Sequence, residues 1–399
     1  MTHDDKRPDR RLVIAALGIA QILGWGTSFY FPAVFAAAIQ RDAGWQLEWI
    51  VGGTSLGLLV AGLISPQVGR LVDTHGGRPV LLASSLFYAG GLVGVGLAPA
   101  LPIYLAAWVL IGLGMGTGLY DAVFAALGRM YGSDARSAIA SLTLFGGFAS
   151  TVCWPLSALM IDAFGWRNAC FAYAVLHLVL GLPLQMFAMR DGKPHATVAV
   201  ARDAAASPAR LPREGLILAL LATVLSLAAG VGSIVVVHLL IFLRARGFDA
   251  ASAVALGTLF GPAQVAARVI ERVFGGRYHP FWTMLAACAL MTLGLILLTL
   301  NVPVLALAIL LYGGGYGVTW IGRGTLPLAL FGPARFPRLM GKLAFPSLIV
   351  QALAPSAGAY LIETTGTGAT LGLLTGLALI NLLLIGLVWP LSRRTEPSL

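Results

Sequence analysis

The sequence predicts an all-α membrane protein with twelve transmembrane helices in two pseudo-symmetric six-helix bundles. Three observations predict it: an apolar composition, twelve long apolar runs and an internal repeat. Of the 399 residues, 58% are hydrophobic and only 11% are charged, whereas soluble proteins carry about 25% charged residues. Most of the surface must therefore face hydrocarbon, which accepts apolar side chains on the outside of a helix bundle.

The apolar runs have the length of membrane spans, because a spanning helix needs about 20 mainly apolar residues. In the first half the expected spans are Leu12–Ile39, Trp49–Val68, Pro79–Leu97, Ile103–Leu127, Ala138–Ile161 and Ala169–Met189. In the second half they are Leu216–Leu243, Ala251–Val273, Phe281–Leu300, Val304–Leu330, Leu343–Ile362 and Leu371–Trp389.

The two halves repeat one another. The glycines of Gly112–Gly118 in the fourth span recur as Gly313–Gly317 in the tenth, and Pro155 of the fifth span recurs as Pro355 of the eleventh. A polar, Ala/Arg/Pro-rich stretch separates the halves. We therefore expect an N-terminal bundle over residues 1–189, a cytoplasmic linker over 190–214 and a C-terminal bundle over 215–399, with a substrate site between the bundles.

Loop charges predict the orientation, because cytoplasmic loops retain Lys and Arg. If the N-terminus is cytoplasmic, most of the 26 basic residues fall on the cytoplasmic side. The opposite loops then hold only Arg41, Arg167, Arg244 and Arg246. We expect a multi-pass protein of the cell inner membrane with both termini in the cytoplasm.

Several function classes are excluded by what the patterns lack. The net charge of +10 comes from basic residues scattered singly between apolar runs, so no nucleic-acid surface is expected. The three cysteines lie inside apolar runs without paired spacing, which predicts neither a disulfide nor a metal site. The sequence contains no nucleotide-binding loop and no nucleophile triad, so we expect neither an enzyme nor a cofactor.

The segment after the second span carries a recognisable motif. It runs from Gly69 through Asp73 and Gly76 to Arg78, and a degenerate copy with Glu271 and Arg272 follows the eighth span. The first copy resembles the signature Gly-x-x-x-Asp-Arg-x-Gly-Arg-Arg of the major facilitator superfamily, with Thr74 and Gly77 in place of two basic residues. In this interpretation glycine makes the turn, Asp73 caps or pairs near a helix end, and Arg78 anchors at the anionic leaflet.

Within that superfamily the chain resembles the monocarboxylate-porter branch and its bacterial organic-acid relatives. Three segments carry the likeness: Gly24–Ser28 in the first span, Arg136–Ser141 with Phe164–Arg167 around the fifth, and Gln264–Arg268 in the eighth. Gln264 stands where proton-coupled members keep an aspartate, and the first span contains no lysine. These departures leave proton coupling open.

Few ionisable residues lie deep in the spans, and each is a functional candidate because a charge at the bilayer centre costs at least ~2.5–3.5 kcal/mol. Asp121 in the fourth span and Arg323 in the tenth are expected at similar depth. The resemblance implies that spans 1, 4, 7 and 10 line the central cavity. Arg323 and Arg268 could then attract an anion, with Gln264 beside them, while Asp121 carries a proton or pairs with Arg323 as a gate. Arg268 could instead belong to a loop network with Glu271 and Arg272.

Aromatic residues on the cavity-lining spans could enclose a small organic substrate: Trp25, Tyr30, Tyr120, Tyr316 and Trp320. Each could equally serve packing or an interfacial belt. His238, near the outer end of the seventh span, is a candidate proton shuttle or a polar tip at the interface.

We therefore predict a monomeric secondary transporter for a small organic anion, such as a monocarboxylate, that cycles by alternating access. Both a proton-coupled and an uncoupled mechanism are compatible with the sequence. The alternative is an efflux antiporter for drugs or other toxic compounds, with Asp121 as its proton or cation site. A membrane enzyme or sensor built on this scaffold is a third class, but the sequence shows no catalytic constellation or extra domain that would support it.

Overall fold

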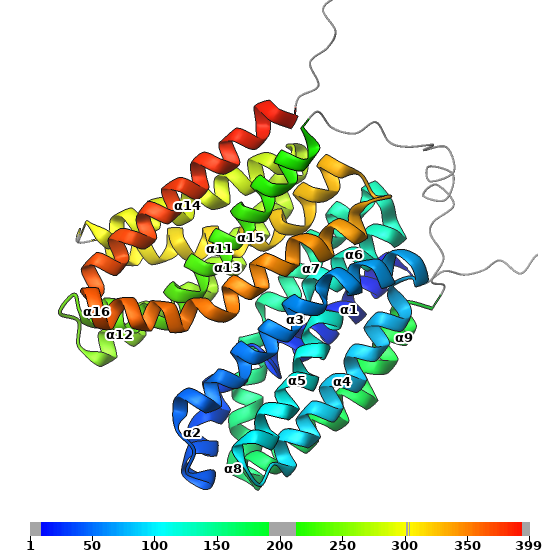
Figure 1. Ribbon diagram of the computed structural model, residues 1–399, viewed down its shortest axis with the longest axis vertical. Helices are drawn as coiled ribbons and strands as arrows, with labels where there is room; N and C mark the ends of the chain where they lie inside the picture. The colour runs from blue at the N-terminus through cyan, green and yellow to red at the C-terminus, as the bar shows by residue number, and fades with distance from the viewer. Residues whose placement is uncertain (1–8, 191–212, 301, 303, 393–399) are drawn as a thin grey trace, which may run out of the picture. The chain divides into compact units, whose positions relative to one another are not determined.

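The computed structural model describes residues 9–190, 213–300, 302 and 304–392, and every regular element in these ranges is a helix (Figure 1). The expected linker over residues 190–214 lies almost wholly outside this description. Large apolar side chains cover the outside of the helices. Leu159, Val179 and Leu383 are each about two-thirds exposed. This surface is suited to lipid and not to water.

The elements of the first half are α1 (Arg10–Gly26), α2 (Pro32–Ala43), α3 (Leu47–His75), α4 (Gly77–Leu97), α5 (Leu101–Gly118), α6 (Tyr120–Tyr131), η1 (Gly132–Asp134), α7 (Ala135–Gly147), α8 (Ala149–Leu176), the π-helical turn η2 (His177–Gly181) and α9 (Leu182–Ala188). Those of the second half are α11 (Glu214–Arg244), α12 (Ala250–Gly257), α13 (Phe260–Phe274), η3 (Gly275–Arg277), α14 (Pro280–Thr299), α15 (Leu305–Phe331) and α16 (Phe336–Ser392).

Eight helical stretches within the described residues are long and apolar enough to cross a membrane. One of them, α16, has 57 residues, which as a straight helix would measure about 85 Å, almost three times the ~30 Å hydrocarbon core. It is divided at Gly366, whose φ of 85° is outside the helical range, and there the chain doubles back (Figure 1). Gly165 divides α8 in the same way with a φ of 83°. The total of twelve spans remains a prediction.

The contacts divide the chain into two compact units. Unit 1 is Met1–Ala201 with Pro333–Lys342, and unit 2 is Arg202–Gly332 with Leu343–Leu399. Helix α16 is therefore shared, because its residues up to Lys342 pack with unit 1 and the rest with unit 2. Pro346 lies just beyond this boundary, and a proline removes the helical hydrogen bond to the carbonyl four residues earlier, which is that of Lys342.

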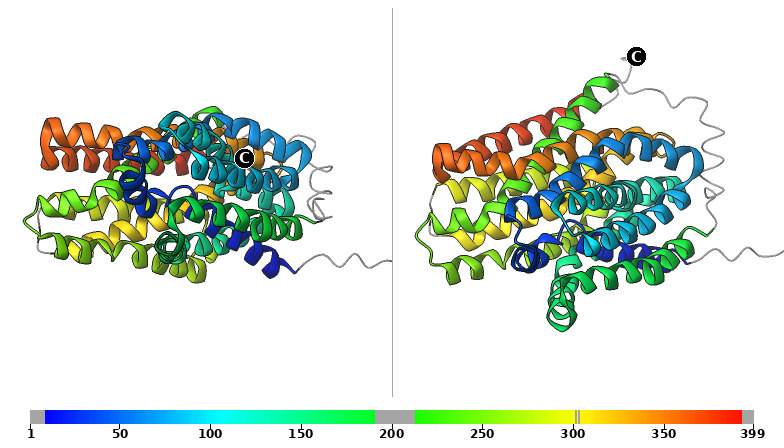
Figure 2. Two further views of the ribbon diagram at one scale, coloured as in Figure 1. Left: turned by 90° about the horizontal axis from the view of Figure 1, so that it is seen from below. Right: turned by 60° about the horizontal axis from the view of Figure 1, so that its bottom comes forward.

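Each unit holds its glycine-rich helix between two neighbours. In unit 1, α5 packs against α3 and α4, and in unit 2, α15 packs against α13 and α14 (Figures 1 and 2). A Cβ atom added at Gly112 would lie 2.7 Å from the Gly57 carbonyl oxygen, and one at Gly315 would lie 2.6 Å from that of Ala287. The repeated glycines thus allow close helix contact, as the sequence indicates.

Four expected spans are interrupted. Span 1 is divided between α1 and α2 by turn residues 27–31, span 4 between α5 and α6 at Leu119, span 5 between α7 and α8 at Phe148, and span 8 between α12 and α13. Helix α3 continues to His75, beyond the expected end of the second span at Val68, and the turn in the motif is made at Gly76, with a φ of 88°. Hydrophobicity alone does not end a helix, so none of these boundaries follows from the apolar runs.

Hydroxyl groups compensate two of the prolines inside helices. Pro66 in α3 leaves the Gly62 carbonyl without its helical donor, and the Ser65 hydroxyl donates to that oxygen over 2.7 Å. Pro355 in α16 likewise leaves the Gln351 carbonyl without its helical donor, and this oxygen accepts from the Ser233 hydroxyl of α11 over 3.2 Å. Both bends therefore keep their backbone groups satisfied, as a membrane interior requires.

The close contact of α5 with α3 can be tested with an alanine pair. Gly112→Ala should lower the melting temperature of the purified protein, because overpacking a core costs about 1–3 kcal/mol. Gly52→Ala is the matched control. That glycine is also helical, but nothing lies within 4 Å of an added Cβ, so the substitution should be neutral or stabilising by up to ~1 kcal/mol. Equal melting temperatures for the two variants would contradict the packing assigned to Gly112.

Candidate functional site

Two helix breaks bring aromatic residues together in unit 1. Trp25 lies in the last turn of α1 before one break, and Tyr120 begins α6 directly after the other. Their ring centroids are 5.1 Å apart, and Tyr30, within the first break, lies 6.4 Å from Trp25. Trp154 of α8 lies 6.1 Å from Tyr30. The three aromatic residues predicted in spans 1 and 4 thus form one cluster.

The break in span 4 is stabilised by a buried side chain from span 1. Helix α5 ends at Gly118, and its last carbonyls lose their helical donors there. Gln21 of α1 is buried and donates through Nε2 to the Gly118 carbonyl over 2.5 Å. Gln21 is not among the predicted site residues, although a glutamine in the middle of an apolar span is a detectable signal.

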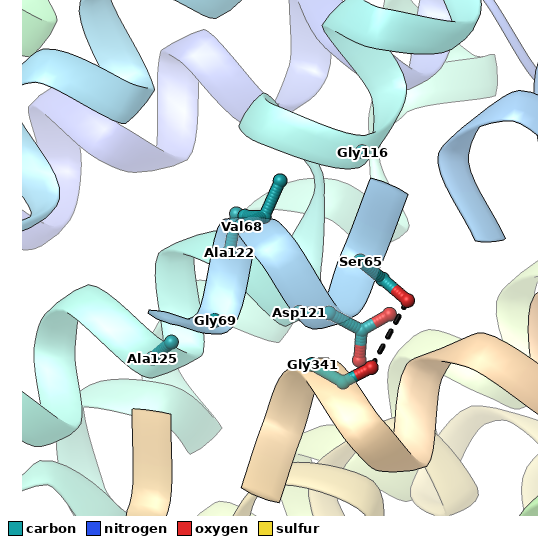
Figure 3. Close-up of a pocket in the computed structure, with 8 residues that line it drawn as sticks. All are labelled: Ser65, Val68, Gly69, Gly116, Asp121, Ala122, Ala125 and Gly341. Carbon is teal, nitrogen blue, oxygen red and sulfur yellow. Dashed lines mark hydrogen bonds between the residues drawn. The ribbon is translucent and has the colours of Figure 1, made fainter. Parts of the chain in front are cut away.

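Asp121 lies in the first turn of α6, where the helix dipole favours a negative charge. It lines a small crevice in unit 1 with Ser65, Gly69, Gly116 and Gly341. Val68, Ala122 and Ala125 complete the lining. Figure 3 shows the carboxylate pointing toward the contact between Ser65 and Gly341. The crevice has room for about one water molecule, so it does not hold an organic substrate.

The wall of this crevice is a close crossing of α3 with the first turns of α16, which we call the α3–α16 crossing (Ser65–Asp73 with Pro337–Gly341). The Ser65 hydroxyl lies 3.0 Å from the Gly341 carbonyl oxygen, and a Cβ atom at Gly69 would lie 2.6 Å from the Pro337 carbonyl oxygen. Asp73 accepts from Nε of Arg338 over 2.6 Å. Two residues of the sequence motif, Gly69 and Asp73, therefore belong to this crossing.

In unit 2, Arg323 is the charged residue of α15. Its side chain is buried, with 3% relative exposure, and Nη2 donates to the hydroxyl of Ser347 on α16 over 2.8 Å. The guanidinium carbon lies 5.5 Å from the ring centroid of Trp320, within the range of a cation–π interaction. The rings of Trp320 and Tyr316 meet edge to face at 6.2 Å. Tyr316, Trp320 and Arg323 follow one another at spacings of four and three residues, so they lie on one face of α15.

Arg268 is equally buried and joins α13 to α15. Its Nε donates to the Gly317 carbonyl over 3.0 Å, and Nη2 lies 3.4 Å from Oε1 of Gln264 one turn earlier. Glu271, by contrast, accepts from the Thr283 hydroxyl of α14 over 2.6 Å. The structure thus pairs the predicted Gln264 with Arg268.

The remaining predicted residues lie apart from these groups. His238 is buried, and its Nε2 faces the carbonyl oxygen of Pro355 at 2.9 Å. Arg272 is exposed, and Arg78 reaches the Arg190 carbonyl at 3.4 Å. Among the described residues, no group of three or more His, Cys, Asp or Glu side chains is placed to hold a metal ion.

Comparison with known proteins places this architecture in a family. The sequence model of the Major Facilitator Superfamily matches residues 16–321. The chain belongs to the major facilitator superfamily. It is thus a multi-pass membrane transporter for small molecules and not an enzyme.

One curated relative of this superfamily member is "Monocarboxylate transporter 3" of Rattus norvegicus, 25% identical over 357 residues, which cover 85% of this chain and 72% of the relative. The solved structure of the proton:xylose symporter XylE, bound to 6-bromo-6-deoxy-D-glucose, is similar with a TM-score of 0.73 at 12% identity, covering 97% of this chain and 96% of that one. A human organic anion transporter has a TM-score of 0.71 at 16% identity, covering 95% and 100%. These structural matches support the fold alone.

The α3–α16 crossing predicts a measurable change in access to the crevice. Gly69→Ala should separate the helices and expose Ala125, which is now buried. With Ala125→Cys as the reporter, a membrane-permeable maleimide should label the Gly69→Ala variant several-fold faster than its parent. The three native cysteines are buried and should contribute little.

Thr74→Ala serves as the control, because Thr74 is exposed and its hydroxyl bonds within α3. It should leave the labelling rate unchanged. An unchanged rate in the Gly69→Ala variant as well would show that the crossing does not limit access.

Proposed function

We propose that this transporter carries a small organic anion, specifically a carboxylate, and that Arg323 is its principal binding residue. The observation that carries the proposal is the burial of the Arg323 guanidinium within a membrane helix, where it contacts the Ser347 hydroxyl and the Trp320 ring. A charge kept in such a place is costly and is retained where it serves transport. Guanidinium presents a planar fork of donors that matches a carboxylate, which makes arginine the suited residue.

The second buried arginine of unit 2 supports an anionic cargo. Arg268 and Arg323 both contribute positive charge to the region around α15, and Gln264 adds no compensating negative charge. The sequence likeness to a protein named as a monocarboxylate transporter points in the same direction. We infer that the aromatic residues Trp25, Tyr30, Tyr120, Tyr316 and Trp320 contact the organic part of the substrate.

We further infer that the protein resides in the inner membrane as a monomer, with both termini in the cytoplasm, and cycles by alternating access between its two six-helix bundles. The asymmetry of basic residues between the loops supports this orientation. The bundles over residues 1–189 and 215–399, with the linker between them, remain part of this proposal.

Efflux of a cationic compound is the second candidate function. The Trp25–Tyr120 ring pair would suit a positively charged aromatic molecule, because aromatic faces attract cations, and Asp121 would supply the coupling charge from its own crevice. The two functions assign the critical charge to opposite residues, Arg323 for an anion and Asp121 for a cation. Substitution of each residue therefore separates them.

Arg323→Ala should reduce carboxylate uptake into proteoliposomes by about tenfold to a hundredfold in kcat/KM, because hydrogen bonds to a charged group contribute about 1.5–3 kcal/mol. Arg323→Lys should retain part of the activity if charge suffices, and little if bidentate contact is required. Uptake of a panel of radiolabelled mono- and dicarboxylates, sugars and organic cations measures this.

Arg244→Ala is the matched control for that experiment. Arg244 is exposed at the end of α11, and its loss should leave uptake unchanged. Normal carboxylate uptake by Arg323→Ala would remove Arg323 from the site. Loss of cation transport in Asp121→Asn, with no carboxylate transported by the parent, would favour the efflux function.

Proton coupling makes a separate prediction. If transport is proton-linked through Asp121, an inward pH gradient should accelerate uptake, and Asp121→Asn should abolish this acceleration while exchange of labelled for unlabelled substrate continues. The neutral amide has the shape of the protonated acid, which explains the retained exchange. Uptake by the unmodified protein that does not respond to the gradient would exclude proton symport, and Asp121 would then be a gate residue.

A further inference from the structure

The break in span 1 is contacted by a buried histidine from span 6. Thr27 is the first turn residue after α1, and its Oγ1 lies 2.8 Å from Nε2 of His177. Thr27 and His177 are both buried, with relative exposures of 0% and 2%. This pair is the direct side-chain contact by which the sixth span reaches the interruption of the first.

The Thr27 hydroxyl contacts both the backbone and the imidazole. Its Oγ1 lies 2.8 Å from the Leu23 carbonyl oxygen and 2.8 Å from Nε2 of His177. The Leu23 carbonyl also accepts from the Thr27 backbone N–H over 2.9 Å, so the hydroxyl is available to the histidine in either hydrogen-bonding role. His177 is thus hydrogen-bonded to the first residue of the backbone break.

Two further features fix the orientation of this ring. Tyr88 of α4 stacks on it, with ring centroids 4.7 Å apart and an angle of 22° between the planes. His177 also begins η2, the π-helical turn of span 6. Such turns shift the register of a helix by one residue and occur frequently at functional sites. The imidazole is thus held between span 3 and span 1 by its neighbours.

The consequence reaches the aromatic cluster. Thr27 lies two residues after Trp25 and three before Tyr30, and the amide of Tyr30 donates to the Trp25 carbonyl across the break over 3.0 Å. A change in the position of Thr27 therefore moves both rings. Ser28, the next residue, donates to the Gly24 carbonyl over 2.5 Å and holds the same turn from within.

We propose that His177 is a positioning residue for substrate recognition: through Thr27 it holds the interrupted first span in the geometry that presents Trp25 and Tyr30. This inference rests on the proposed function in one respect, the contact of those rings with the substrate. In this proposal a residue of the sixth span, which does not itself touch the substrate, determines how the rings of the first span are presented.

Four variants separate the hydrogen bond from packing. His177→Phe keeps a ring against Tyr88 but cannot donate, whereas His177→Gln supplies an amide N–H near the position of Nε2. Thr27→Val removes the hydroxyl that contacts His177 at nearly constant volume, and the double variant His177→Phe/Thr27→Val completes a cycle. Ser157→Ala is the matched control, because it breaks another buried bond of unit 1, 2.7 Å to the Tyr173 hydroxyl, without touching residues 25–31.

The first measurement is carboxylate uptake in proteoliposomes. His177→Phe and Thr27→Val should each raise KM about tenfold with a smaller effect on kcat, and the double variant should be no worse than the poorer single one. His177→Gln should recover most of the affinity. Ser157→Ala should lower the melting temperature but leave KM unchanged. If His177→Phe behaves like Ser157→Ala, with reduced stability and a normal KM, the residue is structural and the proposal is overturned.

The second measurement needs no substrate, so it distinguishes this inference from the proposed function. Tyr30→Cys supplies a reporter in the break, and maleimide labelling in detergent follows its exposure. His177→Phe should change the labelling rate several-fold, and His177→Gln should restore it. A protein that carries no carboxylate but shows this pattern would contradict the proposed function alone. A labelling rate insensitive to His177 would overturn the positioning role whatever the substrate is.

Discussion

The structure depends on one constraint: inside a membrane, a backbone carbonyl that leaves the helical ladder needs another donor. At three interruptions or bends of the spans, a side chain supplies that donor. Gln21 donates to Gly118 at the break in span 4, Ser65 to Gly62 at the bend of α3, and Ser233 to Gln351 at the bend of α16. These three polar residues on apolar helices keep the bent geometry of the candidate site compatible with hydrocarbon.

Most of the fold could be predicted, because length and hydrophobicity determine which segments can span a bilayer. The ends of α4 and α14 fall within a few residues of the expected spans. The interruptions could not be predicted in the same way. Leu119 breaks span 4 although neither it nor its neighbour Tyr120 disfavours a helix. The cause is tertiary, since the carbonyl released at Gly118 is satisfied by a side chain from another span.

For the candidate site, residue types were easier to predict than partners. Arg323, Arg268 and Asp121 stand out in the sequence because ionised groups are rare in apolar runs. Their surroundings depend on contacts between distant segments. Gly341, which lies against Ser65, and Ser347, which accepts from Arg323, have no sequence signal of their own. The contact of Thr27 with His177 could not be predicted either, since a threonine in a span usually bonds its own helix, as Thr27 also does to Leu23.

The shared helix α16 has a mechanical consequence. Its first turns pack with unit 1, and from Leu343 onward it packs with unit 2. The helical bond that Pro346 removes, to the Lys342 carbonyl, is one of the four that would cross this boundary. A bend at this boundary therefore costs one hydrogen bond fewer than a bend in an uninterrupted stretch of α16. The missing bond weakens the connection between the turns of α16 in the α3–α16 crossing and the rest of the helix.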